Sequence, residues 1–313
     1  MKRKVVLHGT STLIVSLPSK WVKKHGIKKG DELEVKENGN NLIIFPSDNE
    51  SNSSITLNLC SLDRTSIMFT IRSVYRKGYD NVTLTWKNPL TKHIRLGQNV
   101  KVISVIHEEV NRLVGYEIVQ EKGNICVIKD LQKVDFKEFD NILRKIFLLI
   151  QNAFETLING IKNNDLILLD TIEEIHNTIT KFVSYCLRII NKKGCPNPKN
   201  SLSMYRIISI LDRLIDSIKN CSRTVILNNI KFSNEGIKLM KMFQESFKHY
   251  HTLFYHYSIE PITKMSELRE IVAQRLNQQK NMLNDDEVMI INYMYGVMEM
   301  LLDLTEARVS IEY

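Results

Sequence analysis

Apolar and polar residues alternate along the first 46 positions of the chain. The period-two positions carry Val5, Leu7, Leu13, Val15, Leu17, Leu33, Val35, Leu42 and Ile44. This alternation predicts short β-strands. Pro18 and Ser19 predict the start of a short helix that ends near His25, and Gly26 stands where a C-terminal cap is expected. The predicted order is therefore strand, strand, short helix, strand, strand.

Turn signals divide these strands, and a polar segment follows them. Lys29-Gly30-Asp31 and Asn38-Gly39-Asn40 are typical of turns. Residues 47–54, with the sequence SDNESNSS, predict a linker. A segment of 46 residues with one helix of a turn or two is too small to bury a core by itself.

The hydrophobic pattern becomes mixed over residues 54–131. It predicts a strand in SITLNLC, a helix over 62–77 closed by Gly78, a strand in NVTLTW, and a second helix over 97–112. YEIVQEKGNICVIKD predicts a hairpin around Lys122-Gly123-Asn124. We expect a small sheet with helices on one face, without a phosphate loop, nucleophile elbow or metal-ligand spacing.

Helical periodicity then dominates residues 135–313. Six amphipathic stretches cover about 136–163, 165–193, 201–229, 233–258, 262–283 and 285–311. Their short connections predict two antiparallel helix bundles. The expected fold class is multidomain α+β, with an N-terminal β domain (1–46), a central α/β domain (54–131) and a C-terminal domain of tandem three-helix bundles (135–313).

An internal repeat supports the tandem. Residues 204–220 and 291–307 align at an offset of 87 residues, with apolar residues at five equivalent positions. Acids also coincide, at Asp212 with Glu299 and at Asp216 with Asp303. The third and sixth helices are therefore predicted to be equivalents.

Net charge and cysteine content limit the kinds of partner and the cellular compartment that we expect. The net charge is +8, and residues 1–46 contribute +5 of it through nine Lys or Arg against four Asp or Glu. Such a local basic patch favours a polyanionic partner. The five scattered cysteines predict neither disulfides nor a zinc finger, and we expect each to be a buried apolar residue. Without an apolar run long enough to cross a bilayer or a signal core, we expect a cytoplasmic protein without membrane insertion.

An ordered set of short motifs runs through the first 46 residues. They are Arg3-Lys4-Val5, Gly9, Ile14-x-x-Leu17-Pro18, Lys23-Lys24-x-Gly26-Ile27, Lys29-Gly30-Asp31-x-Leu33-x-Val35 and Leu42-Ile43-Ile44. Through these motifs the segment resembles the AbrB/SpoVT swapped-hairpin DNA-binding domain. The resemblance implies a homodimer in which two protomers exchange hairpins and close each other's apolar strand faces. It also implies DNA binding by Arg3, Lys4, Lys23 and Lys24.

Paired acids mark the helical half. Asp212 and Asp216 lie one helical turn apart, so their carboxylates repel each other and a nearby positive charge should compensate the repulsion. A bound metal ion would supply it, as would Lys or Arg from a neighbouring helix, and a solvated face is the commonest setting for such a pair.

The helical half also resembles the PhoU family of phosphate-uptake regulators, through Asp212-Arg213-Leu214-Ile215-Asp216 and Glu299-Met300-Leu301-Leu302-Asp303. Glu173-x-x-x-Asn177, with His176 beside it, matches that family's second helix. The resemblance implies an iron or zinc cofactor held by Glu173, Asp212, Asp216, Glu299 and Asp303. The complete architecture resembles archaeal phosphate-uptake regulators.

Three functions compete at this point. The first is a DNA-binding transcriptional regulator of phosphate uptake and homeostasis, not an enzyme, whose helical half senses a signal or docks a partner. The second is a carboxylate-bridged metalloprotein, for which Glu173-x-x-His176 supplies only one of the two motifs that such bundles use. The third is an adaptor that binds a phosphate transporter or a kinase and not DNA, which the basic N-terminal segment disfavours.

Overall fold

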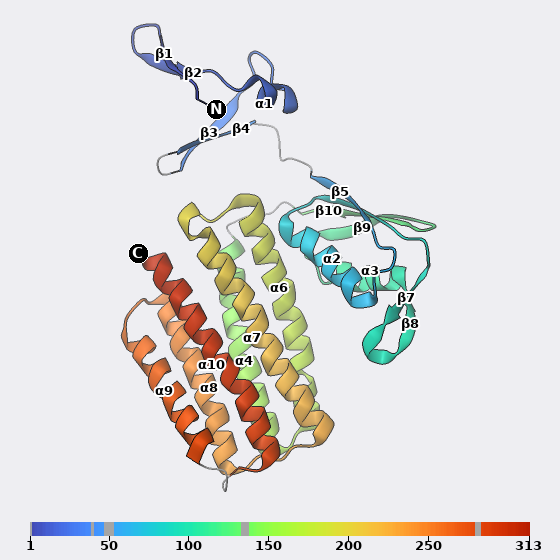
Figure 1. The fold of residues 1–313 in the computed structure, drawn as a ribbon, viewed down its shortest axis with the longest axis vertical. Coiled ribbons are helices and arrows are strands. Elements are labelled where there is room, and N and C mark those ends of the chain that lie inside the picture. Colours follow the sequence, from blue (N-terminus) through green and yellow to red (C-terminus); the bar gives the residue numbers. More distant parts are fainter. Residues whose placement is uncertain (1, 39–40, 47–52, 133–137, 279–282) are drawn as a thin grey trace. The chain divides into compact units, whose positions relative to one another are not determined.

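The computed structural model describes residues 2–38, 41–46, 53–132, 138–278 and 283–313. The chain forms two compact units, Met1–Asn52 and Ser53–Tyr313. Three predicted features fall wholly or partly outside the described residues. They are the Asn38-Gly39-Asn40 turn, most of the 47–54 linker, and two parts of the predicted helices, namely the start at 136 and residues 279–282. The mixed α+β class is confirmed, with a small N-terminal β region and a C-terminal region of several helices (Figure 1).

The N-terminal unit has the predicted order of elements. Its elements are β1 (Val5–His8), β2 (Thr12–Val15), α1 (Ser19–Lys24), β3 (Leu33–Asn38) and β4 (Asn41–Pro46). β1 pairs antiparallel with β2, and β3 pairs antiparallel with β4. Helix α1 begins after Pro18, and Gly26 has a positive φ of 65° directly after the C-cap residue His25. Glycine adopts that conformation without the steric cost that a side chain brings.

Ser53–Tyr313 begins with a four-stranded sheet in the order β5-β6-β10-β9, in which only the β5–β6 pair is parallel. Its elements are β5 (Ser54–Asn58), α2 (Arg64–Lys77), β6 (Asn81–Thr85), α3 (Val102–Val110), β9 (Tyr116–Lys122) and β10 (Ile125–Asp130). Asp63 caps the start of α2 with its carboxylate, and Gly78 ends it with a φ of 101°. The predicted strands, the first helix and the hairpin of residues 54–131 are therefore confirmed.

The hydrophobic pattern did not predict a second hairpin. β7 (Leu90–His93) and β8 (Gln98–Lys101) pair antiparallel, and a short 3-10 turn (Ile94–Leu96) connects them. The predicted helix over 97–112 accordingly begins only at Val102, because residues 98–101 belong to β8. The alternation of apolar and polar residues is weak here, because the outer face of the hairpin mixes Leu90 with Lys92 and Lys101.

Helices form the remainder of the unit. They are α4 (Phe139–Asn163), α5 (Leu166–Asp170), α6 (Ile172–Lys193), α7 (Ser201–Asn228), α8 (Asn234–Tyr255), α9 (Glu260–Gln278) and α10 (Asp285–Glu312). The second predicted stretch is divided into α5 and α6, with Asp165 capping α5. The other five predicted stretches each correspond to one helix.

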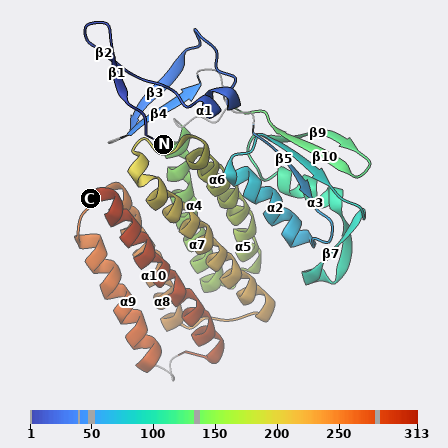
Figure 2. The same cartoon turned by 45° about the horizontal axis from the view of Figure 1, so that its top comes forward.

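The helices contact one another both within and between the two predicted three-helix groups. Helices α4, α6 and α7 pack on one another, as do α8, α9 and α10, while α7 packs against α10 and α4 against α8. Both views place α2 beside α6, so the sheet layer and the helices share one unit (Figures 1 and 2). The division of this unit at residue 135 stays a prediction.

Within the described part of the chain, one helix, α10, is long and apolar enough to span a membrane by length and composition. It packs against α7 and α8 and carries Glu299, Asp303 and Arg308. These are the properties of a core helix in a soluble protein, so the helix is weak evidence for a membrane span.

Candidate functional site

The predicted DNA-binding residues all lie at the surface of the N-terminal unit. Arg3 and Lys4 precede β1, while Lys23 and Lys24 form the last turn of α1. All four side chains are exposed. Among the described residues of this unit, none of the four forms an ion pair. Their charges are therefore available to an anionic partner.

The same unit leaves its apolar strand residues in water. Val5, Leu7, Leu13 and Val15 are between 50% and 68% exposed, and Val6 and Ile14, on the other face of the hairpin, are 55% and 46% exposed. No residue among those whose burial is described in Met1–Asn52 is buried. Among the residues whose burial is described, a single copy of this unit therefore has no buried core, and neither face of the β1–β2 hairpin is covered.

A second site lies where α2, α6 and α7 meet. Asp212 on α7 accepts a hydrogen bond from Arg76 Nη2 of α2 at 2.9 Å and another from Thr180 Oγ1 of α6 at 3.1 Å. Arg76 also donates to Ser184 Oγ of α6, at 3.2 Å from Nε and 3.1 Å from Nη2. One guanidinium therefore links the sheet layer to two helices.

Asp216 has different partners one turn further along α7. Its Oδ1 lies 2.5 Å from Lys219 Nζ and 2.9 Å from His176 Nε2. Burial acts to raise the pKa of Asp216, but hydrogen bonds from His176 and Lys219 outweigh it and lower the pKa to about 2. The carboxylate is thus held in its charged form.

The remaining predicted metal ligands are also paired with cations. Glu173 lies 2.6 Å from Arg223, Glu299 lies 2.7 Å from Arg269, and Asp303 lies 3.2 Å from Arg206. Among the described residues, no group of three or more His, Cys, Asp or Glu is placed to hold a metal ion. The residues do not offer a shared donor set, so iron or zinc binding stays a prediction that this geometry does not favour.

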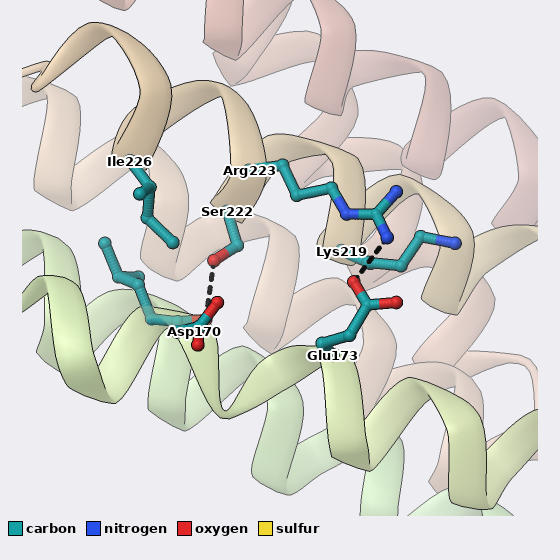
Figure 3. Close-up of a pocket in the computed structure, with 7 residues that line it drawn as sticks. Asp170, Glu173, Lys219, Ser222, Arg223 and Ile226 are labelled. Atoms are coloured by element: carbon teal, nitrogen blue, oxygen red, sulfur yellow. Dashed lines mark hydrogen bonds and ion pairs between the residues drawn. The ribbon is translucent and has the colours of Figure 1, made fainter. Parts of the chain in front are cut away.

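A pocket beside this cluster lies between α5, α6 and α7 (Figure 3). It is a small, partly open pocket with a cavity volume of about 40 Å³, lined by Leu169, Asp170, Glu173, Lys219, Ser222, Arg223 and Ile226. Ser222 donates to the Leu169 carbonyl, and Arg223 is paired with Glu173. Two acids balance the two cations, so the pocket has no excess charge that would attract a free anion.

A buried arginine joins α6 to the sheet. The Arg188 side chain is fully buried and donates to the Tyr75 carbonyl at 2.7 Å, to Asp80 at 3.1 Å and to Asp130 at 2.6 Å. Its guanidinium lies over the rings of Tyr75 and Tyr116, at 4.8 and 5.2 Å from their centroids. Lys192, one turn later, also contacts Asp80.

Comparison with known proteins gives a match to a protein family. Residues 6–52 match the family described as "Antidote-toxin recognition MazE, bacterial antitoxin". No curated protein and no solved structure matches the chain. The match covers the N-terminal unit alone and supports the predicted N-terminal swapped-hairpin DNA-binding domain, whose order of strands and helix the structure confirms.

The sequence did not predict which cations form ion pairs with the paired acids. Arg76 stands 136 residues before Asp212, and no local pattern connects them. Arg188 had no signal beyond a charged residue within the predicted helix over 165–193. The sequence named two ways to offset the acids, and one of them, Lys or Arg from a neighbouring helix, is correct for Asp212, which pairs with Arg76. Asp216 instead pairs with Lys219 of its own helix and with His176 of α6.

Proposed function

We propose that the chain is a DNA-binding transcriptional regulator that acts as a homodimer through its N-terminal unit. One observation carries the proposal, namely that both faces of the β1–β2 hairpin are exposed in a single copy. A second copy with the same open faces would cover them, as an exchange of hairpins requires. The match of residues 6–52 to an antitoxin family supports a regulatory domain of this type.

Arg3, Lys4, Lys23 and Lys24 supply the contacts with DNA in this proposal. They lie on exposed strand and helix ends, which meet the phosphate backbone before the base edges. Two copies bring eight such cations to one duplex. The two-fold symmetry of a dimer also favours a roughly palindromic site.

The helical half serves as a sensing or docking part, formed by two equivalent three-helix units. Support comes from the repeat, because Ile207, Leu211 and Leu214 of α7 and the equivalent Met294, Met298 and Leu301 of α10 are all buried. The resemblance of both acid pairs to PhoU favours regulation of phosphate uptake, with a phosphate transporter or a signalling protein as the partner.

Genome-wide mapping of DNA occupancy tests this function, with cells grown at high and at low phosphate. Occupancy upstream of phosphate-uptake genes that changes with phosphate supports the proposal. Occupancy that is specific but indifferent to phosphate contradicts the phosphate part and leaves a regulator of another process. Absence of specific occupancy, with a stable protein partner recovered instead, favours toxin recognition, which the matched family's description names.

A further inference from the structure

The β7–β8 hairpin and its turn, residues 90–101, form a ribbon apart from the four-stranded sheet, and we name it the basic ribbon. Its strands pair only with each other, with Thr91 opposite Val100 and Lys92 opposite Asn99. Figure 1 shows it extending beyond the four-stranded sheet, next to α3. The contacts of Asp212 and Asp216 do not involve it.

One face of the basic ribbon is attached to the rest of the unit. Thr91 is buried and donates from Oγ1 to the Leu62 carbonyl at 2.6 Å, and its neighbour Val100 packs against the core. Because side chains alternate along a strand, Leu90, Lys92 and Lys101 belong to the opposite face. All three are exposed.

The charge of this region has one sign. Residues 87–107 contain Lys87, Lys92, Arg95 and Lys101 and neither Asp nor Glu. These four side chains are exposed and have no ion-pair partner among the residues that the structure describes. The next acids, Glu108 and Glu109, are neutralised by Arg64 and Arg72. The ribbon is therefore complementary to a polyanion.

The tip adds apolar side chains to this charge. Ile94 is 73% exposed and Leu96 is 57% exposed, and Arg95 stands between them. Side chains of this size are stabilised when a partner removes them from water. An arginine flanked by two aliphatic residues fits the DNA minor groove, where arginine reads a narrow groove and aliphatic wedges unstack a base step.

We propose that the basic ribbon inserts its tip into the minor groove of double-stranded DNA as a second DNA contact of this chain. Arg95 enters the groove, Ile94 and Leu96 wedge against a base step, and Lys92 and Lys101 meet the flanking phosphates. This rests on the proposed function, because DNA held by the N-terminal unit raises the local concentration of duplex at the ribbon. An anionic bilayer is the weaker occupant, since three exposed aliphatic residues give little anchoring without a second membrane signal.

Titrations of the full-length protein on two mixed-sequence duplexes, one of about 16 and one of about 50 base pairs, test the ribbon. The variant K92Q/R95Q/K101Q should reduce the slope of log affinity against log salt by up to about 2.7 per protomer on the long duplex only. K145Q/K162Q/K241Q removes the same charge from exposed lysines of α4 and α8 and should leave both slopes unchanged. Thermal unfolding checks that each variant is folded.

A second readout tests the wedge. A long duplex with 2-aminopurine at successive A·T steps should gain fluorescence with the wild type, and I94S/L96S should lose that gain while its salt slope stays the same. Two results would overturn the proposal. One is a wild-type salt slope in K92Q/R95Q/K101Q together with a wild-type fluorescence gain in I94S/L96S. The other is binding to phosphatidylserine vesicles that the ribbon variants lose while their DNA binding is unchanged. Binding of K23A/K24A to the short duplex tests the N-terminal contact by itself. Failure of the ribbon proposal can therefore be distinguished from failure of the proposed function.

Discussion

Arg76 Nη2 at the end of α2 lies 2.9 Å from Asp212 Oδ2 on α7, although 136 residues separate them. Their side chains are 22% and 17% exposed. The contact makes Asp212 part of the connection between the sheet layer and the helices. A role in this connection explains the acid without a metal ion.

The Arg76–Asp212 pair should therefore be measurable as a stabilising contact. R76A should lower the free energy of unfolding by about 1–3 kcal/mol, because it leaves a half-buried carboxylate without its charged partner. R206A removes a more exposed arginine that pairs with Asp303 and should cost about 0–1 kcal/mol. Urea unfolding of R76A, D212A and R76A/D212A gives the coupling through a double-mutant cycle, with R206A as the exposed comparison. Additive effects in that cycle would show that the pair contributes nothing.

Acid pH should weaken the Asp216 contacts within a defined window. Hydrogen bonds from His176 and Lys219 lower the pKa of folded Asp216 to about 2, from an ordinary value of 3.8. A carboxylate whose pKa is lowered on folding contributes stability above the unfolded pKa and loses it as pH falls through the folded pKa. The stability difference between wild type and D216N should hold at pH 6 and shrink from about pH 4 toward 2. A difference that does not vary with pH in denaturant titrations would contradict this assignment.

Arg188 should be the most sensitive position between α6 and the sheet. R188M keeps the length of the side chain but leaves the carboxylates of Asp80 and Asp130 without their buried partner. Breaking a buried ion pair on one side costs about 3–5 kcal/mol. K192Q, which removes a 25%-exposed partner of the same acids, should cost less. Equal unfolding free energies for R188M and wild type would refute the anchoring role.

The exposed apolar faces of the β1–β2 hairpin predict a homodimer that is stabilised by apolar contacts. Leu7 and Leu13 are cross-strand partners and are 61% and 68% exposed. L7S/L13S should weaken the dimer at least about tenfold, since burial of two leucines is worth more than 1.4 kcal/mol. L202S alters an 85%-exposed leucine of α7 and should leave the dimer intact. Sedimentation equilibrium decides, and a wild-type protein that is monomeric at micromolar concentration would rule the dimer out.

The DNA contact predicts a salt dependence. K23A/K24A removes four cations from a dimer and should lower the slope of log affinity against log salt by up to about 3.6, equally for specific and random duplexes. K145A/K241A serves as the matched loss of charge from exposed residues of α4 and α8. Gel-shift titrations at three salt concentrations measure the slopes. Unchanged slopes in K23A/K24A would mean that this basic surface meets another partner, and the adaptor function would then be favoured.

Local pattern was enough to predict most elements. The strands and short helix of residues 5–46, the hairpin at 116–130 and the long helices follow from periodicity, glycine positions and proline, which act over a few residues. Four of the five cysteines are buried as expected, and Cys60 is partly exposed. The β7–β8 hairpin was missed because its outer face mixes apolar and basic residues.

The sequence by itself determined where most strands and helices form, where positive charge gathers, and that two helices carry equivalent acids. Only the tertiary structure decided which cation each acid meets, and that Arg188 is buried against Tyr75, Asp80 and Asp130. The physical reason is range. Backbone preference and amphipathic spacing act between near neighbours, whereas an ion pair forms between whichever side chains packing brings within a few ångströms, as it does for Arg76 and Asp212.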